Sequence, residues 1–167
     1  MIRYCADCGT TTVIERVGTQ EVSVCPGCRR IFFRNPKLVV TGLIEEGGRV
    51  LLVLRDIEPG RGLWGLPGGY VDWDEHPEAA MVRECEEETG ARVRADELIS
   101  VQHILMGEEG IVMLAYRATL VGGQVRARDE VQEVGWFLPD ALPPLAFSSH
   151  RAVLERWSRE RLARGAA

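Results

Sequence analysis

The sequence lacks any apolar run long enough to cross a membrane as a helix. Its first four residues, MIRY, do not begin a signal peptide, so we expect a cytoplasmic protein. It also lacks an excess of positive charge, because 20 Lys and Arg face 25 Asp and Glu, for a formal net charge of −5. Attachment to nucleic acid or to an anionic membrane through a broad basic surface is therefore not expected.

Internal repeats and low-complexity segments are also missing. The 167 residues, 46% of them hydrophobic, are enough for one globular domain with a small appendage. Histidine is scarce, and none of the three is spaced from a partner as a metal ligand would be. We interpret all of them, His76, His103 and His150, as incidental to function.

Four of the five cysteines form two C-x₂-C pairs, which 16 residues separate. The pairs are Cys5 with Cys8 and Cys25 with Cys28. Paired thiolates on two tight turns are typical of a structural Zn²⁺ site, and four cysteines leave no coordination position open for chemistry. Disulfides are the alternative, which a cytosolic setting disfavours.

The zinc module should occupy residues 1–34 and a larger domain residues 35–167. Residues 10–24 are expected to form a hairpin between the two cysteine pairs. Gly9 and Gly27 would give the turns their conformational freedom. A module of this size buries too little apolar surface to fold without the metal.

The larger domain interleaves strands and helices without regular βαβ repetition. A hairpin is expected over residues 38–54, with further strands within 92–106, 111–121 and 131–137. One helix should begin near Pro77 and end at Gly90. A closing helix over 149–162 would bury four apolar residues, Val153, Leu154, Trp157 and Leu162. We therefore predict an α/β protein with a mixed sheet between helices.

The first of these helices carries an unusual concentration of glutamate. Glu84, Glu87 and Glu88 stand at positions i, i+3 and i+4, so their carboxylates share one face. Like charges at this spacing destabilise a helix unless a cation lies between them, and hard oxygen ligands suit Mg²⁺ or Mn²⁺. The alternative is a solvated acidic surface helix. Cys85, on the opposite face, is interpreted as a small buried hydrophobe.

The same region resembles the Nudix box. Its fixed positions are matched by Gly69, Glu75, Arg83, Glu84, Glu87, Glu88 and Gly90. Cys85 and Ala91 fill the two aliphatic positions. The resemblance extends over about residues 36–147 and implies an α/β/α sandwich. The cysteine module is similar to the zinc ribbon that precedes some Nudix enzymes, among them NADH pyrophosphatases and a group hydrolysing FAD or ADP-ribose.

Beyond the box, the sequence departs from two of these subgroups. The NADH pyrophosphatase signature is absent, with residues 100–103 as a poor substitute. The proline of many ADP-ribose pyrophosphatases is also missing near Leu105 and Met106. Residues 145–147, Leu-Ala-Phe, instead resemble the FAD/ADP-ribose zinc-ribbon group.

The resemblance implies roles for individual residues. Glu84, Glu87 and Glu88 would bind Mg²⁺ together with a backbone carbonyl at Gly69, and Glu87 or Glu88 would contact the attacking water. Arg83 would orient the carboxylates as an ion-pair partner. The candidate substrate-binding residues are Arg55, Gly68, Glu130 and Glu133. Trp64 and Phe33 could stack on a base, although core packing is the expected role for both.

Three functions follow from different classes. The first is a Mg²⁺-dependent pyrophosphohydrolase of ADP-ribose, FAD or NADH, with a small nucleotide as partner and a homodimer as one possible assembly. The second is a non-catalytic nucleotide sensor that regulates transcription, which the intact glutamates and the acidic balance disfavour. The third is a hydrolase of oxidised nucleoside triphosphates, in which an appended ribbon would be unusual.

Overall fold

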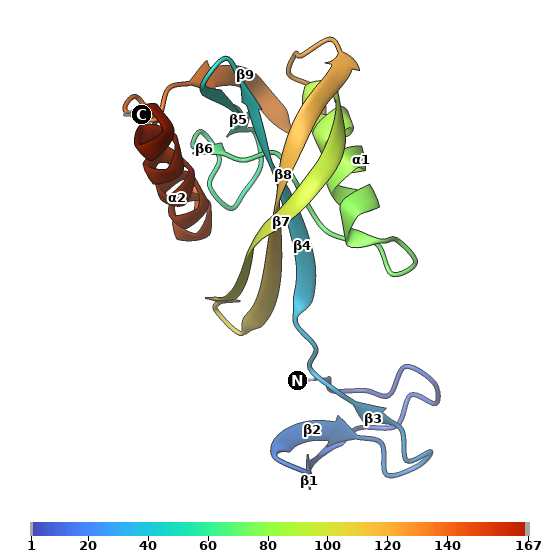
Figure 1. Cartoon of the computed structure of the whole chain (residues 1–167). Helices are drawn as coiled ribbons and strands as arrows, with labels where there is room; N and C mark the ends of the chain where they lie inside the picture. The colour runs from blue at the N-terminus through green and yellow to red at the C-terminus, as the bar shows by residue number, and fades with distance from the viewer. Residues whose placement is uncertain (1, 166–167) are drawn as a thin grey trace. The chain divides into compact units, whose positions relative to one another are not determined.

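Residues 2–165 are described by a computed structural model, in which the chain divides into two units, Met1–Pro36 and Lys37–Ala167 (Figure 1). The first unit is a three-stranded antiparallel sheet of β1 (Val13–Val17), β2 (Gln20–Val24) and β3 (Ile31–Phe32). The predicted hairpin is β1 with β2, which turns at Gly18, where φ is +61°. Val22, Val24, Cys5 and Cys25 are its buried hydrophobic residues.

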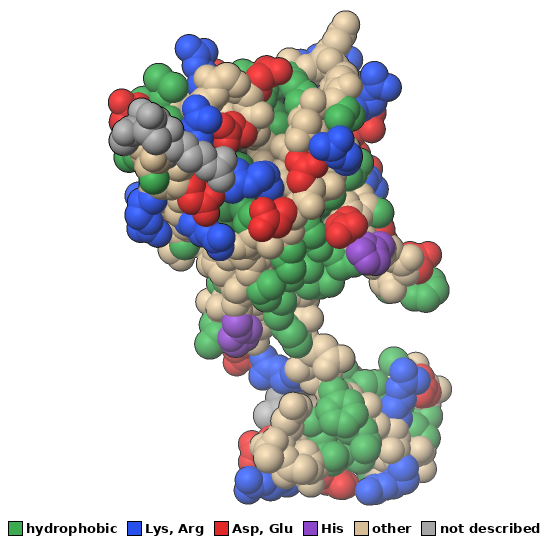
Figure 2. All heavy atoms as spheres, in the orientation of Figure 1, with side chains coloured by type: hydrophobic (Ala, Val, Ile, Leu, Met, Phe, Trp, Pro, Cys, Tyr) green, Lys and Arg blue, Asp and Glu red, His purple; other side chains and the backbone are tan. Residues whose placement is uncertain are grey.

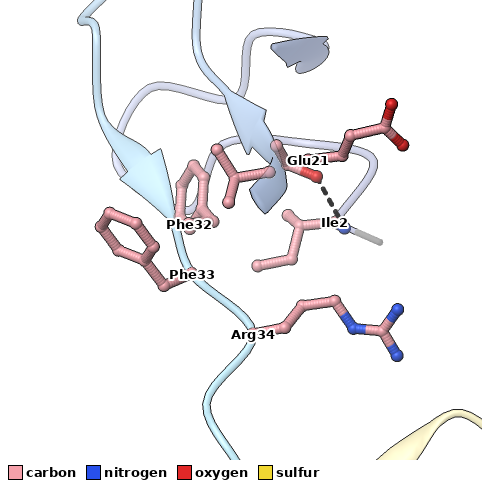
Figure 3. A pocket seen from close by; sticks show the side chains of 7 residues that line it. Ile2, Glu21, Phe32, Phe33 and Arg34 are labelled. Atoms are coloured by element: carbon pink, nitrogen blue, oxygen red, sulfur yellow. Dashed lines mark hydrogen bonds between the residues drawn. The ribbon is translucent and has the colours of Figure 1, made fainter. Parts of the chain in front are cut away.

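A small pocket of about 180 Å³ opens in this first unit. Figure 3 shows Ile2, Phe32, Phe33 and Arg34 around it. Binding sites for drug-sized ligands are usually about 300–1,000 Å³, so this pocket is small for a dinucleotide. The prediction that Phe33 packs in a core is wrong, because its side chain is 53% exposed beside this pocket.

The second unit is built on a six-stranded mixed sheet in the order β6-β5-β4-β8-β7, with β9 also paired to β5. The strands are β4 (Lys37–Glu46), β5 (Arg49–Arg55), β6 (Trp64–Gly65), β7 (Ala91–Met106), β8 (Glu109–Gly123) and β9 (Val131–Phe137). The central pair β4–β8 is parallel and the other pairs are antiparallel. The β4–β5 turn uses Gly47 and Gly48, whose φ values of +56° and +78° suit a two-residue hairpin loop.

Two helices cover opposite faces of this sheet: α1 (Pro77–Thr89) and α2 (Ser148–Gly165) (Figure 1). Side chains alternate along β4, so Val40 and Ile44 pack under α1 while Leu43 packs under α2. The predicted α/β/α sandwich is therefore confirmed. Within residues 2–165, no helix is both long and apolar enough to span a membrane.

Helix α2 buries three of its four predicted residues. Val153, Leu154 and Trp157 are buried, and Trp157 Nε1 donates a hydrogen bond to Glu45 Oε2 at 2.8 Å. The prediction for Leu162 is wrong, because its side chain is 68% exposed. At about 100° per residue, Leu162 lies roughly 140° around the helix from Trp157 and so points away from the sheet.

Charged side chains of both signs are interspersed over the visible face of the second unit (Figure 2). This distribution agrees with the formal net charge of −5 and with the absence of a basic excess in the sequence. It gives no electrostatic reason to expect a nucleic-acid surface on this face.

Helix α1 approaches β4 closely at Gly42. A Cβ atom at this position would lie 2.8 Å from Cys85 Sγ and 3.1 Å from Met81 Sδ. We expect Gly42→Ala to lower the free energy of unfolding by about 1–3 kcal/mol through overpacking. Urea denaturation would measure the change.

A second substitution, Cys85→Ala, tests whether overpacking causes the loss of stability in Gly42→Ala. Alone it should destabilise the protein by leaving a cavity, whereas on the Gly42→Ala background it should restore stability by making room. Equal effects of Cys85→Ala on both backgrounds would contradict close packing at this point.

Candidate functional site

Helix α1 is capped at both ends by local sequence. His76 is the N-cap, and its Nδ1 accepts a hydrogen bond from the backbone N–H of Glu78 at 3.4 Å. Pro77 occupies the first turn, as predicted. Gly90 ends the helix with φ +65°, and its N–H donates to Glu86 O at 2.8 Å. The N-cap contact gives His76 a structural role, because its ring begins the helix that carries the glutamates.

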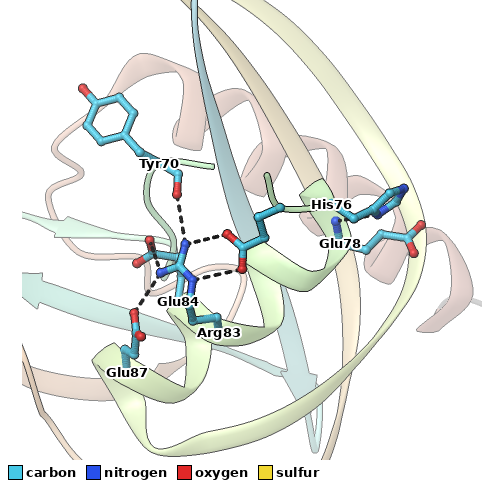
Figure 4. Close-up of polar contacts among 7 residues, drawn as sticks. Tyr70, His76, Glu78, Arg83, Glu84 and Glu87 are labelled. Atoms are coloured by element: carbon cyan, nitrogen blue, oxygen red, sulfur yellow. Dashed lines mark hydrogen bonds and ion pairs between the residues drawn. The ribbon is translucent and has the colours of Figure 1, made fainter. Parts of the chain in front are cut away.

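The guanidinium of Arg83 joins three carboxylates (Figure 4). Nε and Nη2 donate to the two oxygens of Glu75 at 3.0 and 2.9 Å. Nη1 donates to both Glu84 and Glu87 at 2.9 Å, and Nη2 donates to the Tyr70 carbonyl at 3.1 Å. An arginine has five N–H donors, so these five bonds leave none for a substrate phosphate. Its contacts are those of the ion-pair partner expected from the sequence.

Glu88 stands apart from this network. Its side chain is buried, with 8% of the residue exposed, and Oε2 accepts the Gly68 N–H at 2.9 Å. Burial raises the pKa of Glu88 to about 8, and the nearby charge of Glu84 acts in the same direction. Burial also raises the pKa of Glu84, against the opposing effect of Arg83. These carboxylates therefore favour a proton or a bound cation.

The glycine loop, residues 66–69, runs directly against the carboxylates. A Cβ at Gly69 would lie 2.6 Å from the Glu84 carboxylate, and one at Gly68, where φ is +149°, would lie 2.1 Å from Val40 O. Gly69 O accepts the Val40 N–H at 2.9 Å, and a carbonyl oxygen has a second lone pair. One buried and one half-buried carboxylate against this loop offer the hard oxygen donors that a divalent cation such as Mg²⁺ prefers.

Two of the remaining candidates lie within electrostatic reach of these glutamates. The charge of Arg55, at the end of β5, lowers the pKa of Glu88, and the charge of Glu130 raises the pKa of both Glu84 and Glu88. Glu130 has φ +59°, which is uncommon for a residue other than glycine and frequent at functional sites. Glu133 is exposed on β9, and no hydrogen bond or ion pair joins it to the glutamates among residues 2–165.

Arg55 is held from two sides. Its Nε donates to Pro59 O at 3.0 Å, and the guanidinium carbon lies 5.1 Å from the centroid of the Phe147 ring. Its two terminal nitrogens make no hydrogen bond to the described part of the chain. In contrast to Arg83, it therefore has donors left for a ligand.

His150, near the start of α2, makes a structural contact that the sequence does not indicate. Its ring is buried, and Nδ1 accepts the Leu66 N–H at 3.0 Å. Burial and the charge of Arg55 lower the pKa of His150 to about 4, so the ring is neutral near pH 7. No spacing rule could identify this contact, because 84 residues separate its partners.

The four cysteines of the first unit form one cluster, with all four sulfur atoms within 4.8 Å of one another. Cys5 Sγ lies 3.6 Å from Cys28 Sγ, and Cys8 Sγ lies 3.4 Å from Cys25 Sγ. Disulfide bonds need about 2.05 Å. Four thiolates around Zn²⁺ at about 2.3 Å would be about 3.8 Å apart, so the cluster fits such a metal.

The two cysteine turns share one backbone pattern. Gly9 N–H donates to Cys5 O and Arg29 N–H donates to Cys25 O, each at 2.9 Å. Positive φ occurs at Gly9 (+70°) and at Arg29 (+63°). The prediction that Gly27 supplies this freedom is wrong, since the left-handed residue is the fourth after the first cysteine in each turn.

Comparison with known proteins finds relatives of this chain in sequence and in structure. A model of the NUDIX domain matches residues 34–157. An ADP-ribose pyrophosphatase of Methanocaldococcus jannaschii is 31% identical over 129 residues, which cover 75% of this chain and 76% of that protein. The NAD-capped RNA hydrolase NudC of Pseudomonas aeruginosa is 33% identical over 146 residues, covering 86% of this chain but 50% of NudC. The chain thus spans half the length of that relative.

A solved structure is similar over almost the whole chain. The crystal structure of a NUDIX hydrolase from Nitrosomonas europaea matches with a TM-score of 0.88 and 31% identity. The match covers 97% of this chain and 93% of that one.

The cysteine cluster predicts that the purified protein contains about one zinc ion per chain. Cys25→Ser should lose this zinc, because one of four ligands is removed, whereas Cys85→Ala should retain it because Cys85 lies in the other unit. Elemental analysis would measure both variants. A metal-free wild type, or an unchanged zinc content in Cys25→Ser, would contradict the assignment.

The buried carboxyl of Glu88 predicts a pH dependence of stability in the presence of a chelator. Its pKa is raised from 4.5 to about 8, so between these values the folded state keeps a proton that the unfolded state has released. The free energy of unfolding should therefore fall as pH rises through this range. Urea denaturation at several pH values would measure the slope.

Glu88→Gln should flatten this pH dependence because it removes the titrating group. Glu86→Gln, an exposed neighbour on the same helix, should leave it unchanged. The same slope in wild type and Glu88→Gln would show that another group causes it.

Proposed function

The chain belongs to the Nudix family of hydrolases, and we propose that it is a Mg²⁺-dependent pyrophosphohydrolase of nucleoside diphosphate derivatives, with ADP-ribose as its preferred substrate class. The single observation that carries this proposal is the buried carboxyl of Glu88 beside the half-buried carboxylate of Glu84 on α1, both against the glycine loop at Gly68 and Gly69. Burying the Glu88 carboxyl beside a second carboxylate is costly without a cation.

The proposed cation site consists of Glu84 and Glu88, with Glu87 at its exposed edge and the Gly69 carbonyl from the loop. A bound Mg²⁺ would neutralise diphosphate oxygens and lower the pKa of a water molecule. Arg83 holds Glu84 and Glu87 in place and does not bind substrate, because all its donors are used.

The proposed diphosphate contact is Arg55, whose terminal nitrogens are available for two parallel hydrogen bonds to phosphate. The charge of Arg55 lowers the pKa of Glu88, which burial raises, so the two side chains lie in the same electrostatic neighbourhood. One diphosphate could then contact the Arg55 guanidinium and a cation bound by Glu88. Gly68, with its N–H committed to Glu88, serves the substrate indirectly by keeping that carboxylate in place. Glu130 is assigned as the acceptor of the proton from the attacking water, or as a further metal ligand. Glu133 has no assigned role.

ADP-ribose is favoured over a capped RNA for two reasons. The relative that matches about three quarters of its own length bears the name ADP-ribose pyrophosphatase, whereas NudC matches over half. The net charge of −5 also gives no broad attraction for a polynucleotide. The zinc ribbon, in this proposal, has a structural metal and no part in the hydrolysis.

A substrate screen tests the proposal. With Mg²⁺ the wild type should convert ADP-ribose to AMP and ribose 5-phosphate faster than it cleaves FAD, NADH, NAD⁺, diadenosine polyphosphates or oxidised dGTP. Glu88→Gln should lower kcat/KM by about 100-fold or more, because a ligand of the charge-stabilising cation is lost. Product chromatography would measure both rates.

Glu86→Gln is the matched control, since it removes one carboxylate from the same helix at an exposed position. It should retain the wild-type rate. Equal inactivity of the wild type and Glu88→Gln on every nucleotide would overturn the proposed function.

A further inference from the structure

Residues 144–150 form the end of the connection from β9 to α2 and the first residues of α2, and this segment is hydrogen-bonded to β6. Trp64 N–H donates to Pro144 O at 3.0 Å, and Ala146 N–H donates to Trp64 O at 2.8 Å. Ala146 also packs tightly on Gly60, because a Cβ atom added at Gly60 would lie 2.8 Å from the Ala146 Cβ. The backbone of this segment is therefore held in place immediately before Phe147.

Phe147 supports the guanidinium of Arg55. The ring lies under it at 5.1 Å, the range of a cation–π contact, while Pro59 O binds Arg55 Nε from another direction. Long arginine side chains lose conformational freedom when they bind a ligand. An arginine that is already held by a ring and a carbonyl loses less, so Phe147 preorganises Arg55.

His150 supports the glycine loop in a comparable way. Its Nδ1 accepts the Leu66 N–H, two residues before Gly68, whose own N–H donates to Glu88. The contact is close, because a Cβ at Gly65 would lie 3.0 Å from the same nitrogen. On the other side, the His150 ring meets the Phe147 ring edge-on at 5.1 Å.

The loop between these contacts has little freedom. Pro67 O accepts hydrogen bonds from Thr41 Oγ1 and from the Gly42 N–H, both at 2.9 Å. One face of the loop is thus tied to β4 and its beginning is tied to α2 through His150. A change at His150 should therefore reach Glu88 through a short backbone connection.

We propose that Phe147 and His150 are positioning residues of the hydrolytic site. Phe147 holds Arg55 toward the substrate diphosphate, and His150 holds the glycine loop that fixes Glu88. The inference rests on the proposed function, because it assigns a diphosphate as the ligand of Arg55. Neither residue touches the reacting atoms, and each acts through the residue that it holds.

A double-mutant cycle tests the role of Phe147. Phe147→Leu should raise KM for ADP-ribose by about three- to tenfold with little change in kcat, because the support of a binding residue is lost. On the Arg55→Ala background the same substitution should have no further effect on KM. Calorimetric binding of the product AMP gives a readout that does not depend on turnover, and the same non-additivity is expected there.

Two substitutions at His150 test its role in holding the glycine loop. The amide oxygen of His150→Asn can replace Nδ1 as acceptor, whereas His150→Leu leaves the Leu66 N–H without a partner. His150→Leu should lower kcat by about tenfold or more and weaken Mn²⁺ binding measured by electron paramagnetic resonance. His150→Asn should restore both to within about threefold of wild type. Arg151→Ala, at an exposed neighbouring position, is the matched control and should behave as wild type.

Additive effects of Phe147→Leu and Arg55→Ala would overturn the role of Phe147. Equal behaviour of His150→Leu and His150→Asn would overturn that of His150. If thermal unfolding shows that His150→Leu is not folded, the Phe147 double-mutant cycle and the activity of His150→Asn test the proposal instead. These failures are distinct from failure of the proposed function, in which the wild type itself would cleave none of the nucleotides.

Discussion

The second unit depends on the way in which one guanidinium compensates the charge of an acidic helix. Arg83 donates all its hydrogens, four to Glu75, Glu84 and Glu87 and one to a backbone carbonyl. Glu84 and Glu87 stand about one turn apart on α1, a spacing at which like charges destabilise a helix unless they are compensated. The compensation stops short of Glu88, which is buried and whose one hydrogen-bond partner within residues 2–165 is a backbone N–H. The helix therefore retains one carboxyl group that favours either a proton or a bound cation.

The sheet brings the other parts of the site to this carboxylate. Strand β4 lies at the centre, and its backbone binds the glycine loop through Val40 and Gly42 while Gly42 lets α1 approach closely. The opposite layer takes part as well, because His150 on α2 accepts the Leu66 N–H of the glycine loop. The site thus combines carboxylates from one helix with support from the other.

The features that sequence could predict are those encoded locally. The box helix, its caps at Pro77 and Gly90, and the alternating strands follow from patterns within a few residues, as does the pairing of the cysteines into two turns. The misses are long-range or depend on register. His150 and Leu66 are 84 residues apart, so no local pattern joins them. Leu162 was predicted to be buried because nearby apolar residues of the same helix are buried. The left-handed conformation at Arg29 could not be predicted, because this conformation usually marks a glycine and the residue here is an arginine.

The central claim is that the buried carboxyl of Glu88 on α1 forms part of a divalent-cation site, and thermal unfolding of Glu88→Gln tests this claim most directly. Without metal, the neutral variant should unfold at a higher temperature than the wild type, because an uncompensated buried carboxyl is removed. Added Mg²⁺ should raise the unfolding temperature of the wild type and have little effect on the variant. A variant that is less stable without metal, and that gains as much from Mg²⁺ as the wild type, would contradict the account.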